Sequence, residues 1–342
     1  MSTPRMLFAA LLMMAITASV GQPQTGEGLM DQPVKKQQPP KATIIFAVFA
    51  ANDEELNNIC YLAESIRQFG GRFREAPIRV YTPDNTTMTD STLKNKLSSL
   101  GIEFKTVSVP KESHWFYYAG KVYAAARAET EAVGKTEVLI WMDEDTIVLE
   151  EPEKFKLDPQ IGFAYRPVMH NRSGSPYSQP PDKFWERIYR LLEIDDSLLF
   201  SMVTPADKQT IRAYFNAGLL VVRPEHGILR NWATGFKILY SDPILAEMCR
   251  NNVTHRIFLH QTALVGALKL LDRKQMMELP EDYNYPLFFH RMFEAAGEFE
   301  SIEGIVTLRY DVYFRDPDPD WASKLKGSPG KIAWLAERLG RK

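Results

Sequence analysis

The sequence has few cysteines and little net charge, and each shortage excludes a class of protein. Its 342 residues include only Cys60 and Cys249, which excludes a disulfide framework and a cysteine-rich zinc site. Lysine and arginine number 41 against 43 acidic residues, a net charge of −2, whereas nucleic-acid-binding proteins usually carry a basic excess. With 45% hydrophobic and 25% charged residues, the composition is that of a globular protein.

The first 21 residues have the layout of a secretory signal peptide. Arg5 precedes an apolar stretch, Leu7–Val20, and Ser19 and Gly21 place small side chains at the −3 and −1 positions of a cleavage site. The stretch is shorter than the roughly 20 residues of a membrane span. An uncleaved anchor is the alternative, and only then would the protein be attached to a membrane. The expected location is the secretory pathway, in the lumen if the cell is eukaryotic.

The segment 22–41 is rich in Gln, Pro, Gly and Lys and lacks apolar periodicity, which predicts a flexible linker. A single folded domain is expected at 42–342, where strand patterns alternate with helical patterns. This alternation is typical of crossover units in a parallel sheet. We therefore predict an α/β fold with a Rossmann-like, mostly parallel sheet flanked by helices. Strands are expected at 43–49, 78–81, 103–107, 137–142, 161–165 and 213–222, and helices at 52–68, 89–100, 118–133, 183–192, 229–240 and 261–271.

Three consecutive acids, Asp143, Glu144 and Asp145, directly follow the strand that ends at Met142. Ligands of parallel α/β sheets bind beyond the carboxyl ends of the strands, and residues two apart on extended backbone point the same way. Asp143 and Asp145 therefore predict a site for Mg²⁺ or Mn²⁺, which bind hard oxygen ligands and phosphates. A ligand-free acidic turn is the alternative, although adjacent carboxylates repel unless a cation or donor offsets them.

The surroundings of this triplet resemble the core of GT-A fold nucleotide-diphospho-sugar transferases. The segment KVYAAARAETEAVGKTEVLIWMDEDTIVLEEPEKF has their order of helix, hydrophobic strand, Asp-x-Asp motif, Val-rich strand and proline. Further on, YFNAGLLVVRPE, LHQTALVGAL and LPEDYNYP resemble three later motifs of family 8-like glycosyltransferases. The four motifs occur in the family's order over roughly residues 43–310.

The resemblance implies a metal-dependent glycosyltransferase. Such an enzyme moves a sugar from a nucleoside-diphosphate sugar to a hydroxyl group of a glycan or another acceptor, with Mn²⁺ or Mg²⁺ as cofactor. By this resemblance Asp143 and Asp145 bind the metal, Asn216 and Gln261 lie at the reacting sugar, and no nucleic acid is involved. The residues expected to bind the donor are Asn52, Asp53, Lys121, Asp143 and Glu144.

Several of these residues have an alternative interpretation that requires no ligand. Asn52 and Asp53 have the residue types that cap the following helix. Lys121 could be a solvated surface lysine, and Gln261 a polar residue at the start of a helix. For Asn216, which lies in an otherwise apolar strand, a functional role is favoured because a buried amide needs partners.

Two features of the family are replaced in this sequence. The usual Asp before the Gln is His260, and the C-terminal motif that carries a metal-binding His gives way to LRYDVYFRDPDPDW. His290 is expected to be the third metal ligand, with His260 as a second candidate, and a half-buried histidine without a metal is the alternative for both. The missing motif also leaves open a catalytically silent domain that binds a glycan or a protein partner.

Two expectations about the structure follow from these assignments. Asn216 should face the same cleft as Asp145, because both are placed at the ligand-binding edge of one sheet. The substitution Asp145→Asn should leave the fold intact, because an acidic turn after a strand contributes little to the core.

Overall fold

The computed structural model describes residues 42–84, 90–311 and 320–340. The predicted signal peptide and linker lie outside these residues. By its internal contacts the chain divides into units 1–39 and 40–342, and all described residues belong to the second. In the ranges described, no helix is both long and apolar enough to cross a membrane.

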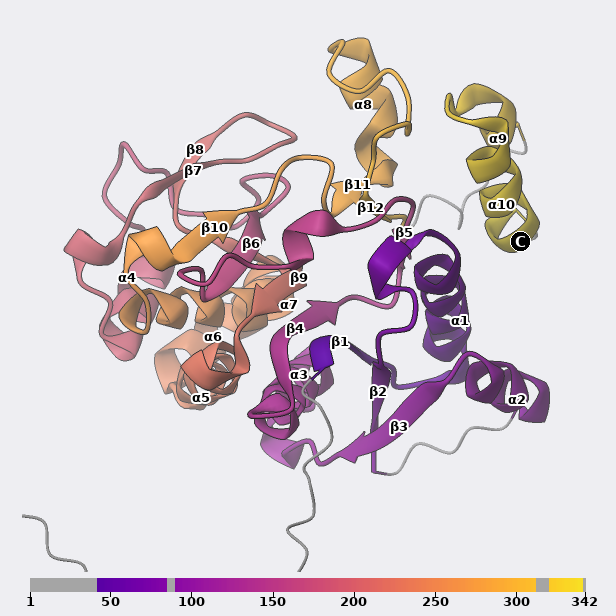
Figure 1. Cartoon of the computed structure of the whole chain (residues 1–342). Helices are drawn as coiled ribbons and strands as arrows, with labels where there is room; N and C mark the ends of the chain where they lie inside the picture. The colour runs from indigo at the N-terminus through magenta and orange to yellow at the C-terminus, as the bar shows by residue number, and fades with distance from the viewer. Residues whose placement is uncertain (1–41, 85–89, 312–319, 341–342) are drawn as a thin grey trace, which may run out of the picture. The chain divides into compact units, whose positions relative to one another are not determined.

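A seven-stranded sheet forms the centre of the described unit (Figure 1), in the order β10-β6-β9-β4-β1-β2-β3. Pairings are parallel except where β9 meets β4 and β6, which confirms the predicted mostly parallel sheet. The strands are β1 (Ala42–Phe49), β2 (Ile78–Pro83), β3 (Ile102–Val107), β4 (Thr136–Met142), β6 (Phe163–Pro167), β9 (Phe215–Val222) and β10 (Met276–Glu278).

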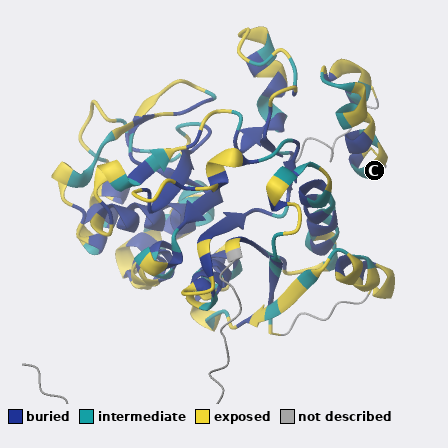
Figure 2. Cartoon of the chain, in the orientation of Figure 1, coloured by how far each residue is buried: buried dark blue, intermediate teal, exposed yellow. Residues whose placement is uncertain are grey.

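Helices cover both faces of this sheet, which explains the continuous apolar runs of its central strands. In β1, Ile45 packs into one hydrophobic cluster with α3 and α5, whereas Ile44 and Phe46 pack into another with α1 and α2. Figure 2 shows the strands mostly buried and the outer sides of the helices exposed. These helices are α1 (Asp53–Phe69), α2 (Ser91–Ser99), α3 (Ala119–Ala132), α4 (Lys183–Leu192), α5 (Ile228–Ser241), α6 (Pro243–Asn251) and α7 (Val253–Thr262).

A small second sheet lies beyond the end of β4. It has the order β11-β12-β5, and β12 is antiparallel to β5 with Arg309 opposite Thr146. This register places the end of β12 beside the acidic triplet, and the Tyr310 N–H donates to the carbonyl of Asp145 at 3.1 Å. The remaining strands and α-helices are β5 (Thr146–Val148), β7 (Ser201–Val203), β8 (Thr210–Arg212), β11 (Tyr285–Pro286), β12 (Thr307–Arg309), α8 (His290–Ala295), α9 (Trp321–Lys324) and α10 (Pro329–Leu339).

The helix predicted at 261–271 is wrong in its bounds. The α-helix α7 begins at Val253, and only a 3₁₀ segment, Ala263–Lys269, follows it. The Asn252 side chain starts α7 by accepting the Thr254 N–H at 2.9 Å, a capping signal that the sequence prediction did not use. Gln261 consequently lies in the last turn of a helix and not at its start.

Both cysteines, Cys60 and Cys249, are free and buried. Burial raises the pKa of each thiol to about 11. Each therefore packs in the core as a neutral thiol, and the two do not form a disulfide.

A buried carboxylate ties α3 to α5. Glu129 accepts the backbone N–H groups of Leu229 and Arg230 at 3.2 and 2.9 Å, and the Arg230 Nε at 3.1 Å. We expect Glu129→Ala to lower the free energy of unfolding by about 2 kcal/mol, because the first turn of α5 loses the acceptor of its N–H groups. Urea unfolding measures this, with the exposed Glu186→Ala of α4 as control. A loss no larger than the control's would contradict the role of Glu129.

Candidate active site

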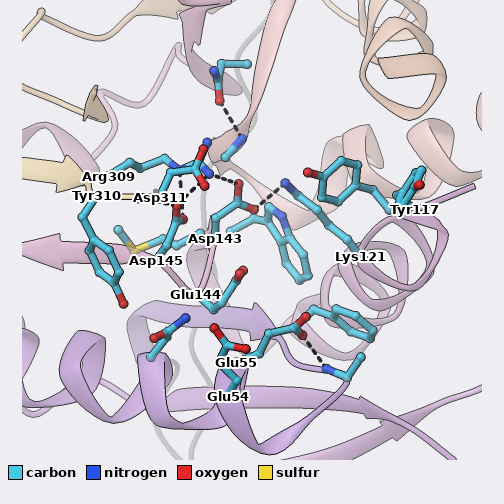
Figure 3. A pocket seen from close by; sticks show the side chains of 18 of the residues that line it. Glu54, Glu55, Tyr117, Lys121, Asp143, Glu144, Asp145, Arg309, Tyr310 and Asp311 are labelled. Atoms are coloured by element: carbon cyan, nitrogen blue, oxygen red, sulfur yellow. Dashed lines mark hydrogen bonds and ion pairs between the residues drawn. The ribbon is translucent and has the colours of Figure 1, made fainter. Parts of the chain in front are cut away.

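A cavity of about 360 Å³ lies where the carboxyl ends of β1 and β4 meet the second sheet. This volume is within the usual range of small-molecule sites. Figure 3 shows side chains from α1, α3, the acidic triplet and the end of β12 around it. The Asp, Glu, Lys and Arg residues of its lining are Glu54, Glu55, Asp143, Glu144, Asp145, Asp311, Lys121, Arg309 and Arg338.

Both aspartates of the Asp-x-Asp motif are paired with cations. Arg309 donates Nε and Nη2 to the two carboxylate oxygens of Asp145, each at 2.9 Å. The same Nη2 lies 3.3 Å from Asp143 Oδ2, and the Lys121 ammonium forms an ion pair with Asp143 Oδ1. The backbone N–H of Asp311 adds a hydrogen bond to Asp145 Oδ2 at 3.1 Å. Two cations therefore offset the repulsion expected between the adjacent carboxylates.

Lys121 is brought to the cavity by the first turn of α3. Its side chain is 10% exposed, and its Nζ lies 5.4 Å from the centre of the Tyr118 ring. Lys121 is therefore not the solvated surface lysine of the alternative interpretation. Glycine at position 120 allows the start of α3 to pack against Phe49 of β1, because a Cβ there would lie 2.4 Å from the Phe49 ring.

The charges in the cavity shift the pKa values of their neighbours. Burial alone would raise the pKa of Asp143, but Lys121 and Arg309 outweigh burial and hold that pKa below its usual value. Burial, together with Asp145 and Asp143, raises the pKa of Glu144 to about 8. Burial and the Lys121 charge lower the pKa of His260 to about 3. At neutral pH Glu144 is therefore largely protonated and His260 is neutral.

Asn216 lines the cavity together with Asp145, which confirms the prediction that they face one cleft. The direction of β9 is the reason: Leu219 pairs with Met142 in an antiparallel register, so the start of β9 extends past the end of β4. The Asn216 Oδ1 accepts the Gly218 N–H at 2.8 Å, and the Gln261 Oε1 accepts the Ala217 N–H at 3.0 Å.

Residues 46–271 of the chain match the family described as the Rhodobacterales glycosyltransferase domain. The chain belongs to this family. Its identification as a glycosyltransferase from the ordered motifs is thereby confirmed, and the protein is an enzyme of this class. Among curated proteins none matches the chain.

Solved structures of glycosyltransferases are similar to this transferase at low sequence identity. The galactosyltransferase LgtC, in complex with donor and acceptor sugar analogs, is 14% identical, and the match covers 87% of this chain and 97% of that chain with a TM-score of 0.45. GlyE of Streptococcus pneumoniae is 14% identical over 88% of this chain and 61% of its own, with a TM-score of 0.44. Mouse xyloside xylosyltransferase 1 is 10% identical, and the match covers 80% of this chain and 99% of that chain with a TM-score of 0.42.

Asn52 and Asp53 do not line the cavity of the transferase. Asn52 is exposed and caps α1, because its Oδ1 accepts the Glu55 N–H at 3.0 Å. Asp53 is the first residue of α1. The α1 residues that do reach the cavity are Glu54, Glu55, Asn58 and Tyr61, which the sequence analysis did not select. The capping interpretation therefore replaces donor binding for Asn52, and we no longer assign Asp53 to the donor.

His290 is not brought to the aspartate pair. It is buried in the cluster around the second sheet, where its Nδ1 lies 2.7 Å from the Tyr285 hydroxyl. Its assignment as a metal ligand is therefore corrected: the ring packs in a local core and does not line the cavity. His260 does line it, with its Nδ1 2.9 Å from the Ile257 carbonyl and its ring 4.5 Å from that of Tyr118.

The donor atoms in the cavity do not fit a divalent cation. Over the described ranges, no group of three His, Cys, Asp or Glu side chains is arranged to hold a metal ion. All four carboxylate oxygens of Asp143 and Asp145 already lie against Arg309 or Lys121. An ion between these oxygens would also lie beside the guanidinium, whose positive charge would repel it.

Arg309 and Gly218 were not among the residues predicted from the sequence. A Cβ at position 218 would lie 2.9 Å from Arg309 Nη1, from Asn216 Oδ1 and from Asp143 Oδ2, so only glycine leaves room for these three groups to converge. The available signals were the arginine of LRYDVYF, in the segment that replaces the family's C-terminal motif, and the glycine two residues after Asn216.

Proposed function

We propose that this glycosyltransferase takes its sugar from a nucleoside-diphosphate sugar and transfers it to a hydroxyl group of the acceptor. The observation that carries the proposal is the convergence of Arg309, Lys121 and the two aspartates in a cavity at the carboxyl edge of the sheet. This edge is where α/β sheets bind their ligands. A secretory location stays a prediction from residues 1–21.

In the proposed reaction the acceptor oxygen forms a bond to the anomeric carbon of the donor sugar. The bond from that carbon to the diphosphate oxygen breaks, and its electron pair leaves with the nucleoside diphosphate. The proton of the acceptor hydroxyl passes to water or a carboxylate. Fixed positive groups next to the departing diphosphate stabilise the charge that develops there.

Asn216 and Gln261 have a positioning role in this proposal. Their side-chain oxygens accept backbone N–H groups of β9, and both residues line the cavity. They therefore fix the shape of the wall that faces the aspartates, where the sugar is proposed to lie. Glu54, Glu55 and Glu144 lie on the α1 side of the cavity (Figure 3). Their carboxyl groups are placed to accept hydrogen bonds from hydroxyl groups of the donor substrate.

A panel of UDP-, GDP-, CDP- and ADP-sugars tests the proposal. The full chain is incubated with each donor and a mixture of hydroxyl acceptors, once with Mn²⁺ and once with excess EDTA, and the released nucleoside diphosphate is measured. We expect release of the nucleoside diphosphate from at least one donor. In Asp143→Asn the rate of release should fall about 100-fold, because Lys121 loses the ion pair that positions it. The exposed Asp158→Asn is the control.

The alternative, a silent domain that binds a glycan or a partner, predicts a different outcome. In that case no donor is turned over in either condition, and calorimetry detects no binding of nucleoside diphosphates. That pair of results would contradict the proposed donor class.

A further inference from the structure

Two cations approach Asp143 from different elements. Lys121 comes from α3 and Arg309 from the end of β12, and Figure 3 shows them on either side of this carboxylate. The side chains of Asp143 and Asp145 are 10% and 9% exposed, and that of Arg309 is 20% exposed. These ion pairs therefore form inside the cavity and are not a surface feature.

The four ion-paired side chains balance in charge without a metal ion. Asp143 and Asp145 contribute two negative charges, and Lys121 and Arg309 contribute two positive charges. A divalent cation held by the same two carboxylates would give the same total. The protein therefore already supplies, with its own side chains, the positive charge that a divalent ion would bring.

The guanidinium of Arg309 has one edge engaged by Asp145, and the residue also lines the cavity. Nε and Nη2 bond to Asp145. Nη1 lies on the Gly218 side, where a Cβ of residue 218 would come within 2.9 Å of it. Guanidinium N–H groups match phosphate oxygens in geometry and keep their charge at all physiological pH values. The other arginine of the lining, Arg338, forms ion pairs with Glu64 and Glu337.

We infer that Arg309 and Lys121 take the place of a divalent cation: they bind the diphosphate of the donor and stabilise it as it leaves, so that donor binding is independent of metal. This inference rests on the proposed function and specifies how its donor is held. Glu54 and Glu55 lie on the α1 side of the cavity (Figure 3) and would repel the phosphates, which are therefore placed at the Arg309 side.

Calorimetry with UDP, GDP, CDP and ADP tests the inference on the full chain. Each nucleotide is titrated in excess EDTA and again in Mn²⁺. For the nucleotide that binds best, we expect the dissociation constant in EDTA and the dissociation constant in Mn²⁺ to agree within about threefold. Binding that needs Mn²⁺, with a loss of about tenfold or more in EDTA, would overturn the inference and retain the proposed function. An absence of binding in both conditions would overturn the proposed function itself.

Two substitutions identify the groups that hold the phosphates. In EDTA, Arg309→Gln is expected to weaken binding of the nucleoside diphosphate about 30-fold, and Lys121→Met about 10-fold, because each removes a charged donor. Binding of the matching nucleoside, which has no phosphate, should change less than about threefold. Arg127→Gln is the control, since this α3 residue is 41% exposed and pairs with Glu131.

Arg309→Lys separates a phosphate contact from a structural role. It keeps a charge near Asp145 but loses the forked geometry, so diphosphate binding should fall between wild type and Arg309→Gln. Thermal unfolding of each variant checks that the fold is retained. If nucleoside and nucleoside diphosphate lose affinity equally, Arg309 acts only by supporting the cavity, and the inference is overturned.

Discussion

Asp145→Asn is expected to lower the free energy of unfolding by about 3 kcal/mol. The neutral amide cannot balance the charge of Arg309, whose Nε and Nη2 both bond to the Asp145 carboxylate. Removing one member of a largely buried ion pair is costly, because Arg309 then keeps only the longer contact to Asp143, at 3.3 Å. Urea unfolding monitored by tryptophan fluorescence measures the change.

The matched control is the double variant Asp145→Asn with Arg309→Met, which removes both charges. It should be more stable than Asp145→Asn alone, because no charge is left without a partner. The sequence had suggested that Asp145→Asn leaves the fold intact, because it showed a row of like charges and not their partners. A midpoint of unfolding equal to that of the wild type would support that earlier view and contradict the present one.

Gly218→Ala is expected to weaken binding of the nucleoside diphosphate about tenfold or more, with a loss of stability of only about 1–2 kcal/mol. The new Cβ would lie 2.9 Å from groups of Arg309, Asn216 and Asp143. All three are the ends of side chains, so they can move aside, but they then no longer converge on the cavity. Calorimetry and urea unfolding on the same preparations measure the two effects.

Gly330→Ala is the control for this substitution. Gly330 is an exposed residue of α10, and a Cβ there would meet nothing within 4 Å. Unchanged nucleotide binding in both variants would mean that the convergence at Gly218 is not needed for the donor. If Gly218→Ala fails to fold while Gly330→Ala folds normally, Gly218 is needed for the core and not specifically for the site.

Local patterns in the sequence determined the sheet and part of the site. The apolar runs of β1 and β4 indicated strands buried on both faces, and the alternation with helices indicated parallel order. The position of Asp143 and Asp145 directly after β4 placed them at the ligand-binding edge. These predictions succeeded because strand and helix periodicity, and the end of a strand, are properties of adjacent residues.

The tertiary structure alone decided what surrounds the two carboxylates. Arg309 lies 164 residues from Asp145 in the chain, and it reaches the site through the pairing of β12 with β5, each only three residues long. Strands this short carry no periodicity that could reveal their partner. His290 was expected at the metal and packs against Tyr285 instead, and Asn216 reaches the site only because β9 runs antiparallel to β4. Ion pairing and strand register depend on distances between segments far apart in sequence, and those distances exist only after the chain has folded.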